Sequence, residues 1–304
     1  MYRRLLVPLD GSHLAETSLP VVERLAACGA TVVLLHVIES GAPATVHGDR
    51  HLRTAAEAET YLGGLAERLR AAGIAVETHA HAVPEGDVAR SIVAHAQEEG
   101  ADLIALCTHG GGGLRDLLVG SIAQQVLHRG TTPVLLTRPD PAGGAPPFAP
   151  RIVLVPLDGT AAAEAALAPA QEVARHVGAA LHLVMVVPTL GTVRGERQVL
   201  AQALPLATRA TLDLEGEEAR RYLEEVAERL RAGGTTVTTE VRRGDTPSAL
   251  ADKAAEAGVG LVVVATHGRV GVQAVWAGSV TLRLLARTRV PLLLLRMIET
   301  DDRS

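Results

Sequence analysis

The chain has 304 residues, a formal net charge of −5 and a hydrophobic fraction of 47%, so it can build two full cores without disulfides or metals. The acidic balance supplies no broad basic surface, which argues against nucleic acid as a partner. Cys28 and Cys107 are its only cysteines, and no Cys/His cluster has metal-ligand spacing, so neither a disulfide framework nor a zinc site is indicated.

The N-terminus enters directly into a short apolar run, Leu5 to Val7. This run lacks the length and the cleavage site of a signal peptide, and no segment sustains about 18 apolar residues. We therefore expect a soluble, cytoplasmic protein that does not engage a membrane.

In the first half of the chain, short apolar runs alternate with longer stretches of helical periodicity. The runs that predict strands are Arg4 to Leu9, Thr31 to Ile38, Ala75 to Ala82, Asp102 to Cys107 and Pro133 to Thr137. Helices are expected from the N-cap Ser12 to Cys28-Gly29, and over Thr54 to Ala72, Asp87 to Glu98 and Ser121 to His128. Right-handed crossovers between such strands give an open parallel sheet with helices on both faces.

The second half repeats this plan. Its predicted strands are Ile152 to Leu157, Ala180 to Val187, Thr235 to Val241, Gly260 to Ala265 and Pro291 to Leu295. In each copy a long connection follows the second strand, Glu39 to Arg53 and Pro188 to Leu206, and we interpret both as lid-like segments. The expected fold is α/β, with two tandem open parallel five-stranded sheets: residues 1–139 form the first domain, 140–150 a Pro/Gly linker and 151–298 the second domain.

Two motifs recur at matching positions in the two halves. Val7 to Ser12 returns as Val155 to Thr160, and Thr108-His109-Gly110 returns as Thr266-His267-Gly268. Gly120-Ser121 returns as Gly278-Ser279, and in both copies nine residues separate the Gly after the His from the Gly before the Ser. A repeat of about 150 residues has the size of a whole domain. The fixed loop length indicates a site as well as a shared fold.

The loop from Thr108 to Ser121 joins a buried strand to a helix and has the features of an anion site. Gly110 lets the backbone approach a ligand, and the free N–H groups of Gly120, Ser121 and Ile122 open the following helix. A phosphate fits this arrangement. In the second copy the same roles fall to Gly268, Gly278, Ser279 and Val280.

Asp10 lies where the first strand ends, at the same edge of the predicted sheet. Its carboxylate can accept hydrogen bonds from a ribose hydroxyl or hold a Mg²⁺ shared with phosphates, and Asp158 can do the same in the second copy. An adenine needs an apolar wall, which the ends of the second strands supply at Val37 and Val186.

The pattern of Val-Pro-Leu-Asp-Gly-Ser, a Thr-His-Gly loop and Gly-Ser nine residues later resembles the universal stress protein family, once per copy over nearly the whole chain. The resemblance implies an adenine-nucleotide alpha-hydrolase-like, Rossmann-like fold that binds ATP or a related adenine nucleotide (ADP or AMP). It also implies pairing through the last strand, so that the two repeats pair within one chain, and a homodimer of the whole chain is a further possibility.

Carried over to this sequence, the resemblance implies that Asp10 and Asp158 lie by the ribose or a metal, that Val37 and Val186 neighbour the adenine, and that His109 and His267 lie near the phosphates. The residues so assigned to the nucleotide site also include Pro8, Leu9, Thr108, Pro156, Leu157 and Thr266.

The family's loop motif reads Gly-x-x-Gly, nine residues, then Gly followed by Ser or Thr. Its first Gly is replaced by Cys107 in one copy and Ala265 in the other. Arg269 offers a cation to a phosphate in the second loop, so the second site is favoured if only one is filled.

Several of these residues have simpler interpretations. His109 and His267 can bond the loop backbone, and Asp10 and Asp158 can hold the turn that follows the strand. Two histidine pairs leave a metal site as an alternative: His79 and His81 alternate on one predicted strand, and His47 and His51 share the first long connection.

The sequence therefore predicts a cytoplasmic, nucleotide-dependent regulatory module that acts on an unknown protein partner. It contains no Walker Gly-Lys-Ser/Thr and no identifiable catalytic triad. Two alternatives stay open: a slow Mg²⁺-dependent nucleotide hydrolase, and a dimeric scaffold that uses no nucleotide.

Overall fold

The computed structural model describes residues 1–39, 44–83, 87–108, 121–140, 142–145, 148–267 and 280–297. These residues fall into two compact units. The first is built from the described parts of residues 1–149 together with 291–297, and the second from residues 150–266 and 280–290. Within the described ranges, no helix combines the length and the apolarity of a membrane span.

The sheet of the first unit is parallel apart from its last strand. Its strands are β1 (Arg4–Pro8), β2 (Thr31–Glu39), β5 (Ala75–Val83), β6 (Leu103–Cys107), β7 (Val134–Thr137) and β12 (Leu292–Met297). They lie in the order β12-β7-β6-β1-β2-β5. β1 pairs in parallel with both β2 and β6, and its Leu5, Leu6 and Val7 are fully buried. The α/β fold with a mostly parallel sheet is confirmed.

The helices of this unit connect its strands in two directions. They are α1 (His13–Glu16), α2 (Leu19–Ala26), α3 (Ala55–Ala71), α4 (Val88–Glu98) and α5 (Ser121–Arg129). From β1 the chain proceeds outward to β2 and β5, then returns past β1 to β6 and β7. Right-handed connections therefore place α2 and α3 on one face and α4 and α5 on the other. This reversal leaves the carboxyl ends of β1 and β6 uncovered, which is where ligands bind in such sheets.

One predicted helix differs from the structure. The stretch that follows Ser12 forms two helices, because Thr17 and Ser18 interrupt it by bonding with their hydroxyls to the carbonyls of Leu14 and Ala15. Pro20 then lies in the first turn of α2, where its missing N–H costs nothing. Ser12 is the N-cap of α1, as the sequence predicts.

The second unit repeats the parallel order with its own helices. Its strands are β8 (Ile152–Pro156), β9 (Ala180–Val187), β10 (Val237–Arg243) and β11 (Val259–His267), in the order β10-β9-β8-β11. Its helices are α6 (Ala161–Glu164), α7 (Leu167–Val177), α8 (Glu196–Ala203), α9 (Pro205–Ala232), α10 (Thr246–Ala254) and α11 (Val280–Arg287).

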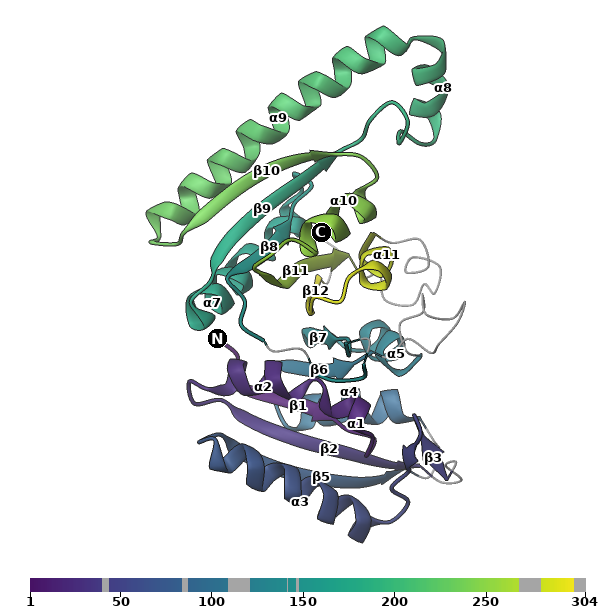
Figure 1. Cartoon of the computed structure of the whole chain (residues 1–304), viewed down its shortest axis with the longest axis vertical. Helices are drawn as coiled ribbons and strands as arrows, with labels where there is room; N and C mark the ends of the chain where they lie inside the picture. The colour runs from purple at the N-terminus through teal and green to yellow at the C-terminus, as the bar shows by residue number, and fades with distance from the viewer. Residues whose placement is uncertain are drawn as a thin grey trace, which may run out of the picture. The chain divides into compact units, whose positions relative to one another are not determined.

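The two long connections have diverged. The described part of the first contains a small hairpin, β3 (Thr45–Val46) paired with β4 (Asp49–Arg50). The second is not a lid-like loop, because it forms α8 and the start of α9, which runs along β10 in Figure 1. Val187, Val193, Leu212 and Ala219 form a buried cluster that holds this helical connection against the end of β9. Apolar packing thus replaces the loop that the sequence predicted.

The last strand of the second repeat belongs to the sheet of the first unit. β12 pairs antiparallel with β7, with Leu293 opposite Leu135 and Leu292 opposite Leu136. These leucines are at most 1% exposed. The pairing that the resemblance implied for the last strands is present, and it covers an edge of β7 that would otherwise offer unpaired N–H and C=O groups.

Replacing Leu293 with Asp tests how much this pairing contributes to stability. A carboxylate at this position is removed from water, and the lost leucine leaves a cavity, so we expect the free energy of unfolding to fall by at least about 3 kcal/mol. Leu206→Asp is the matched control, since Leu206 is 83% exposed. Denaturant unfolding followed by circular dichroism measures both. Equal midpoints for the two variants would show that β12 contributes little.

Candidate functional site

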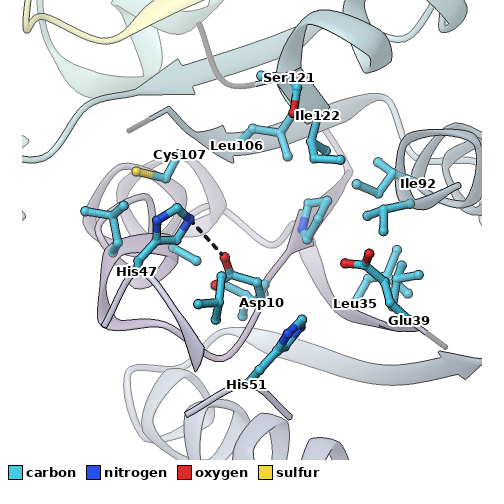
Figure 2. A pocket seen from close by; sticks show the side chains of 18 residues that line it. Asp10, Leu35, Glu39, His47, His51, Ile92, Leu106, Cys107, Ser121 and Ile122 are labelled. Carbon is cyan, nitrogen blue, oxygen red and sulfur yellow. Dashed lines mark ion pairs between the residues drawn. The ribbon is translucent and has the colours of Figure 1, made fainter. Parts of the chain in front are cut away.

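A cavity of about 240 Å³ lies in the first unit at the carboxyl ends of β1, β2 and β6. Figure 2 shows Asp10 near its centre, with Cys107 and Leu106 on one side and His51 approaching from another. The cavity lies where the connections from β1 and β6 separate to opposite faces. The fold therefore produces a hollow at the edge where the sequence predicts the site.

The walls of this cavity are mainly apolar. They come from strand ends, from α1, α4 and α5, and from the segment that carries the β3–β4 hairpin. The lining residues are Pro8, Leu9, Asp10, Leu14, Ala15, Leu35, Val37, Glu39, Val46, His47, His51, Val88, Ile92, Leu106, Cys107, Ser121, Ile122 and Ala123. Six predicted site residues are among them: Pro8, Leu9, Asp10, Val37, Ser121 and Ile122.

The two carboxylate oxygens of Asp10 have different neighbours. Its Oδ1 accepts hydrogen bonds from the Ser12 backbone N–H at 2.9 Å and from the Ser12 hydroxyl at 2.6 Å. Ser12 Oγ in turn accepts from the Ala15 N–H at the start of α1. Asp10 Oδ2 lies 3.6 Å from Nε2 of His47. Both sequence interpretations of Asp10 are thus compatible, because each concerns a different oxygen.

The β3–β4 hairpin brings His47 to the cavity. His47 and Gly48 form its two-residue turn, and both have positive φ, 51° and 90°, as the tight hairpin turn requires. Asp49 attaches this hairpin to α1: its carboxylate accepts from the His13 backbone N–H at 2.9 Å and lies 3.1 Å from His13 Nδ1. The His13 backbone hydrogen bond lowers the pKa of the Asp49 carboxyl, so this attachment persists at neutral pH.

His36 is a structural residue of the site that the sequence analysis did not single out. It is 1% exposed, and its Nδ1 lies 2.7 Å from the carbonyl oxygen of Leu9. Because a carbonyl oxygen only accepts, Nδ1 carries a proton and fixes the backbone next to Asp10. Its Nε2 lies 3.3 Å from the carbonyl oxygen of Leu52, just past the hairpin. A single imidazole inside the apolar run Thr31 to Ile38 is the sequence signal that could have indicated this role.

Cys107 lies at the cavity wall, at the end of β6. Its Sγ is 3.1 Å from the hydroxyl of Thr17, and burial raises the pKa of the thiol. It therefore behaves as a neutral, partly apolar wall residue at the position where the resemblance places a glycine. Thr108, next in sequence, donates its hydroxyl to the Thr137 carbonyl at 3.1 Å, and a role for it in the site stays a prediction.

The second repeat reproduces the turn at the end of its first strand. Asp158 Oδ1 accepts from the Thr160 N–H at 3.0 Å and from its hydroxyl at 2.6 Å, and Thr160 caps α6. Pro156 ends β8, while the Leu157 N–H donates to the Val184 carbonyl and Val186 lies on β9. Thr266 is 6% exposed on β11, and Val280 opens α11 at 38% exposure.

The remaining predicted residues fall in the two loops. His109, Gly110 and Gly120 lie outside the described residues, as do Gly268, Arg269, Gly278 and Ser279, and the His267 side chain is also not described. Their roles stay predictions, and so does the preference for the second site that Arg269 suggests. The predicted anion site is described only where α5 begins, at Ser121 and Ile122.

A sequence model of the universal stress protein family matches residues 1–138 and again 150–296. This chain belongs to the universal stress protein family. Two curated members are similar to one repeat: a universal stress protein of Bacillus subtilis, 28% identical over 45% of this chain and 100% of its own length, and one of Methanocaldococcus jannaschii, 27% identical over 45% of this chain and 96% of its own length.

A similar fold over nearly the whole chain is known from a crystal structure. A universal stress protein from Archaeoglobus fulgidus superposes with a TM-score of 0.69 at 20% identity, over 98% of this chain and 97% of its own. This similarity supports the fold of the chain.

Gly11 tests how closely the hairpin segment approaches the site. Gly11 and Gly159 both have positive φ, 89° and 84°, so alanine strains the backbone equally at each. A Cβ on Gly11 would also lie 2.7 Å from Cγ of Leu52, whereas at Gly159 the nearest atom is 4.0 Å away. We expect Gly11→Ala to lower the unfolding free energy by about 1–3 kcal/mol more than Gly159→Ala, measured by denaturant titration. Equal losses would mean that Leu52 moves freely.

The two cysteines give a second prediction. Cys28 is exposed, while Cys107 is partly buried with a raised thiol pKa. Because only the thiolate reacts, iodoacetamide at pH 8 should alkylate Cys107 at least about tenfold more slowly than Cys28. Peptide mass spectrometry after timed quenching measures both rates in one sample. Comparable rates would place the Cys107 thiol in open solvent.

Proposed function

We propose that the first repeat binds an adenine nucleotide in the cavity between β1 and β6, and that the bound state regulates contacts with a protein partner in the cytoplasm. The observation that carries this proposal is the position of the cavity: it lies at the reversal of strand order, bordered by Asp10 and by the first residues of α5. Nucleotides bind at this point in open α/β sheets.

The walls fit the parts of a nucleotide at different places. Leu35, Val37 and Ile92 provide apolar surface for a flat base, and Val37 is 7% exposed. Asp10 Oδ2 faces His47 and is the acceptor available to a ribose hydroxyl or to a hard cation. The backbone N–H groups at Ser121 and Ile122 open α5, where the helix dipole favours phosphate.

The charges of the cavity suggest a role for Mg²⁺. Asp10 and Glu39 are acidic, and the described lining includes no Lys or Arg. Two carboxylates disfavour a triphosphate unless a cation intervenes, so we expect ATP binding to depend on Mg²⁺ more strongly than AMP binding does. Calorimetry with ATP, ADP, AMP and cyclic AMP, each with and without Mg²⁺, ranks the ligands on the same protein.

Ser121→Asp tests the phosphate position. A carboxylate in the first turn of α5 stabilises the helix but repels a phosphate at that point, so the variant should fold and bind Mg-ATP at least about tenfold more weakly, a change of about 1.4 kcal/mol. Gln124→Asp is the matched control. It adds the same charge to the first turn of α5 at an exposed position that does not line the cavity, and its Kd should stay within about twofold of wild type.

Thiol protection locates the ligand independently of affinity. Because Cys107 lines the cavity and Cys28 does not, saturating Mg-ATP should slow alkylation of Cys107 and leave Cys28 unchanged. Binding heat without Cys107 protection would direct the search to the second repeat. No heat and no protection would leave the nucleotide-independent scaffold as the better description.

A further inference from the structure

Three histidines of the first unit meet outside the nucleotide cavity. His79 and His81 lie two residues apart on the edge strand β5, and His95 lies on α4. The ring centroids of His95 and His81 are 4.9 Å apart, and those of His95 and His79 are 5.9 Å apart. We call these three residues and Glu99 the histidine cluster.

The 4.9 Å separation of His95 and His81 matches that of imidazoles that share one metal ion, and the His95–His79 separation is about 1 Å longer. A Zn²⁺ held by ring nitrogens at about 2.1 Å in tetrahedral geometry places the ring centroids about 5 Å apart. Alternate residues of a strand are about 7 Å apart on the same face, so His79 and His81 can approach one ion from two directions. His95 then completes a three-imidazole set from the helix above them.

A carboxylate lies beside His79. Glu99 follows His95 by four residues at the end of α4, which places it on the same side of the helix. Its Oε1 lies 3.3 Å from Nδ1 of His79. Among the described residues, only the ligand atoms of Glu77, His79 and Glu99 all lie within 4.8 Å of one another, so His81 and His95 must turn their rings to reach the same ion as His79.

Arg4 decides which carboxylate is available. Its guanidinium holds both oxygens of Glu77, at 3.0 and 2.5 Å, and only Oε2 of Glu99. Glu77 is therefore committed to Arg4, whereas Glu99 is oriented by Arg4 with Oε1 directed at His79. This is the supporting contact that ligating carboxylates usually have.

The second repeat provides an internal comparison. Leu35 and Val184 occupy equivalent positions, because each accepts a backbone hydrogen bond from the residue after the first strand, Leu9 or Leu157. In the parallel register Leu35 pairs with His79 and Val184 pairs with Glu240. His79 is therefore equivalent to Glu240, and His81 to Arg242. Asp87 and Asp245 are the N-cap residues of the equivalent helices α4 and α10, so counting from these caps makes His95 equivalent to Lys253.

In the second repeat these three positions form ion pairs. Lys253 Nζ lies 2.8 Å from Glu240 Oε2 and 2.7 Å from Glu256 Oε2, and Arg242 Nε lies 2.8 Å from Glu240 Oε1. The same place in the fold thus holds mutually compensating charges in one copy and three imidazoles in the other. Packing alone does not require histidine there.

We propose that His79, His81, His95 and Glu99 bind a divalent transition-metal ion of the zinc class. Three imidazoles and one carboxylate suit Zn²⁺, Co²⁺ or Ni²⁺ and not Mg²⁺ or Ca²⁺, which prefer all-oxygen ligands. The ion can enter from solvent, since the His81 side chain is exposed while His95 is 9% exposed and anchors the site.

The test uses the full chain without a polyhistidine tag, stripped with a chelator. Zn²⁺ titrated in competition with a chromophoric chelator should show one site with a Kd of about 1 µM or lower. Co²⁺ should give the intense visible absorption of a four-coordinate site. No Zn²⁺ binding at this affinity would overturn the proposal.

The second repeat supplies the variant that removes the site and preserves the fold. His79→Glu, His81→Arg and His95→Lys together recreate its ion pairs, with Glu98 at the place of Glu256, so the protein should unfold as wild type does. We expect Zn²⁺ affinity to fall at least about 100-fold and the Co²⁺ band to disappear. Retained affinity in this folded variant would contradict the assignment.

Four single substitutions separate this site from general binding to surface imidazoles. His176→Ala removes a histidine of α7 and should leave the affinity unchanged, as should Glu77→Gln. Glu99→Gln should weaken binding by about tenfold. A loss with His176→Ala equal to that with His81→Ala would indicate adventitious binding and reject the site. None of these outcomes depends on whether nucleotide binds.

Discussion

The structure of the first unit depends on a constraint at β1. This strand is paired on both sides, with β2 and β6, so its backbone groups are hydrogen-bonded within the sheet. The connections that follow β1 and β6 leave for opposite faces of the sheet, so neither covers the carboxyl end of β1. The turn at Asp10 follows from this position. Asp10 bonds Ser12, Ser12 caps α1, and His36 holds the carbonyl of Leu9. The cavity exists because these local bonds satisfy the backbone without filling the gap.

The two repeats keep this constraint and differ in what surrounds it. Asp158 and Thr160 make the same pair of bonds as Asp10 and Ser12, at nearly the same distances. After the second strand, however, one repeat has a polar hairpin that brings His47 toward the carboxylate, and the other has a helical connection held by an apolar cluster. The two repeats thus share the turn and the strand order, whereas the segment beside the turn is polar in the first repeat and apolar in the second. Differences in ligand between the repeats would arise from these segments.

The elements that the sequence predicted well are those with strong local signals. β1 and β2 are short apolar runs between turn residues, and Thr54 and Asp87 cap α3 and α4 at the starts that the pattern predicted. The position of the cavity followed from topology and the repeated Asp-Gly. The division of the first helix did not, because Thr17 and Ser18 act through hydroxyl bonds that periodicity does not register. The helical character of Pro188 to Leu206 was also missed, since its stability comes from burial against β9.

The histidine cluster also shows what local sequence patterns do not predict, in this case a contact between residues of different elements. The alternation of His79 and His81 was visible in the sequence, and α4 was predicted over the right residues. The meeting of His95 with this pair depends on how α4 lies across β5, and no local pattern encodes that packing. Side chains from separate elements become a constellation only when the tertiary arrangement is known.

The place of β12 has a consequence for biosynthesis. β7 ends at Thr137, but its antiparallel partner spans Leu292–Met297. At about 5–20 residues per second, the ribosome needs on the order of ten seconds to make the intervening chain. During that interval the β7 edge of the first unit has left the ribosome while its partner strand β12 has not yet been synthesised. The sheet of the first unit is therefore completed only after Leu292–Met297 has been translated, and a nascent chain cut short inside the second repeat leaves the β7 edge unpaired.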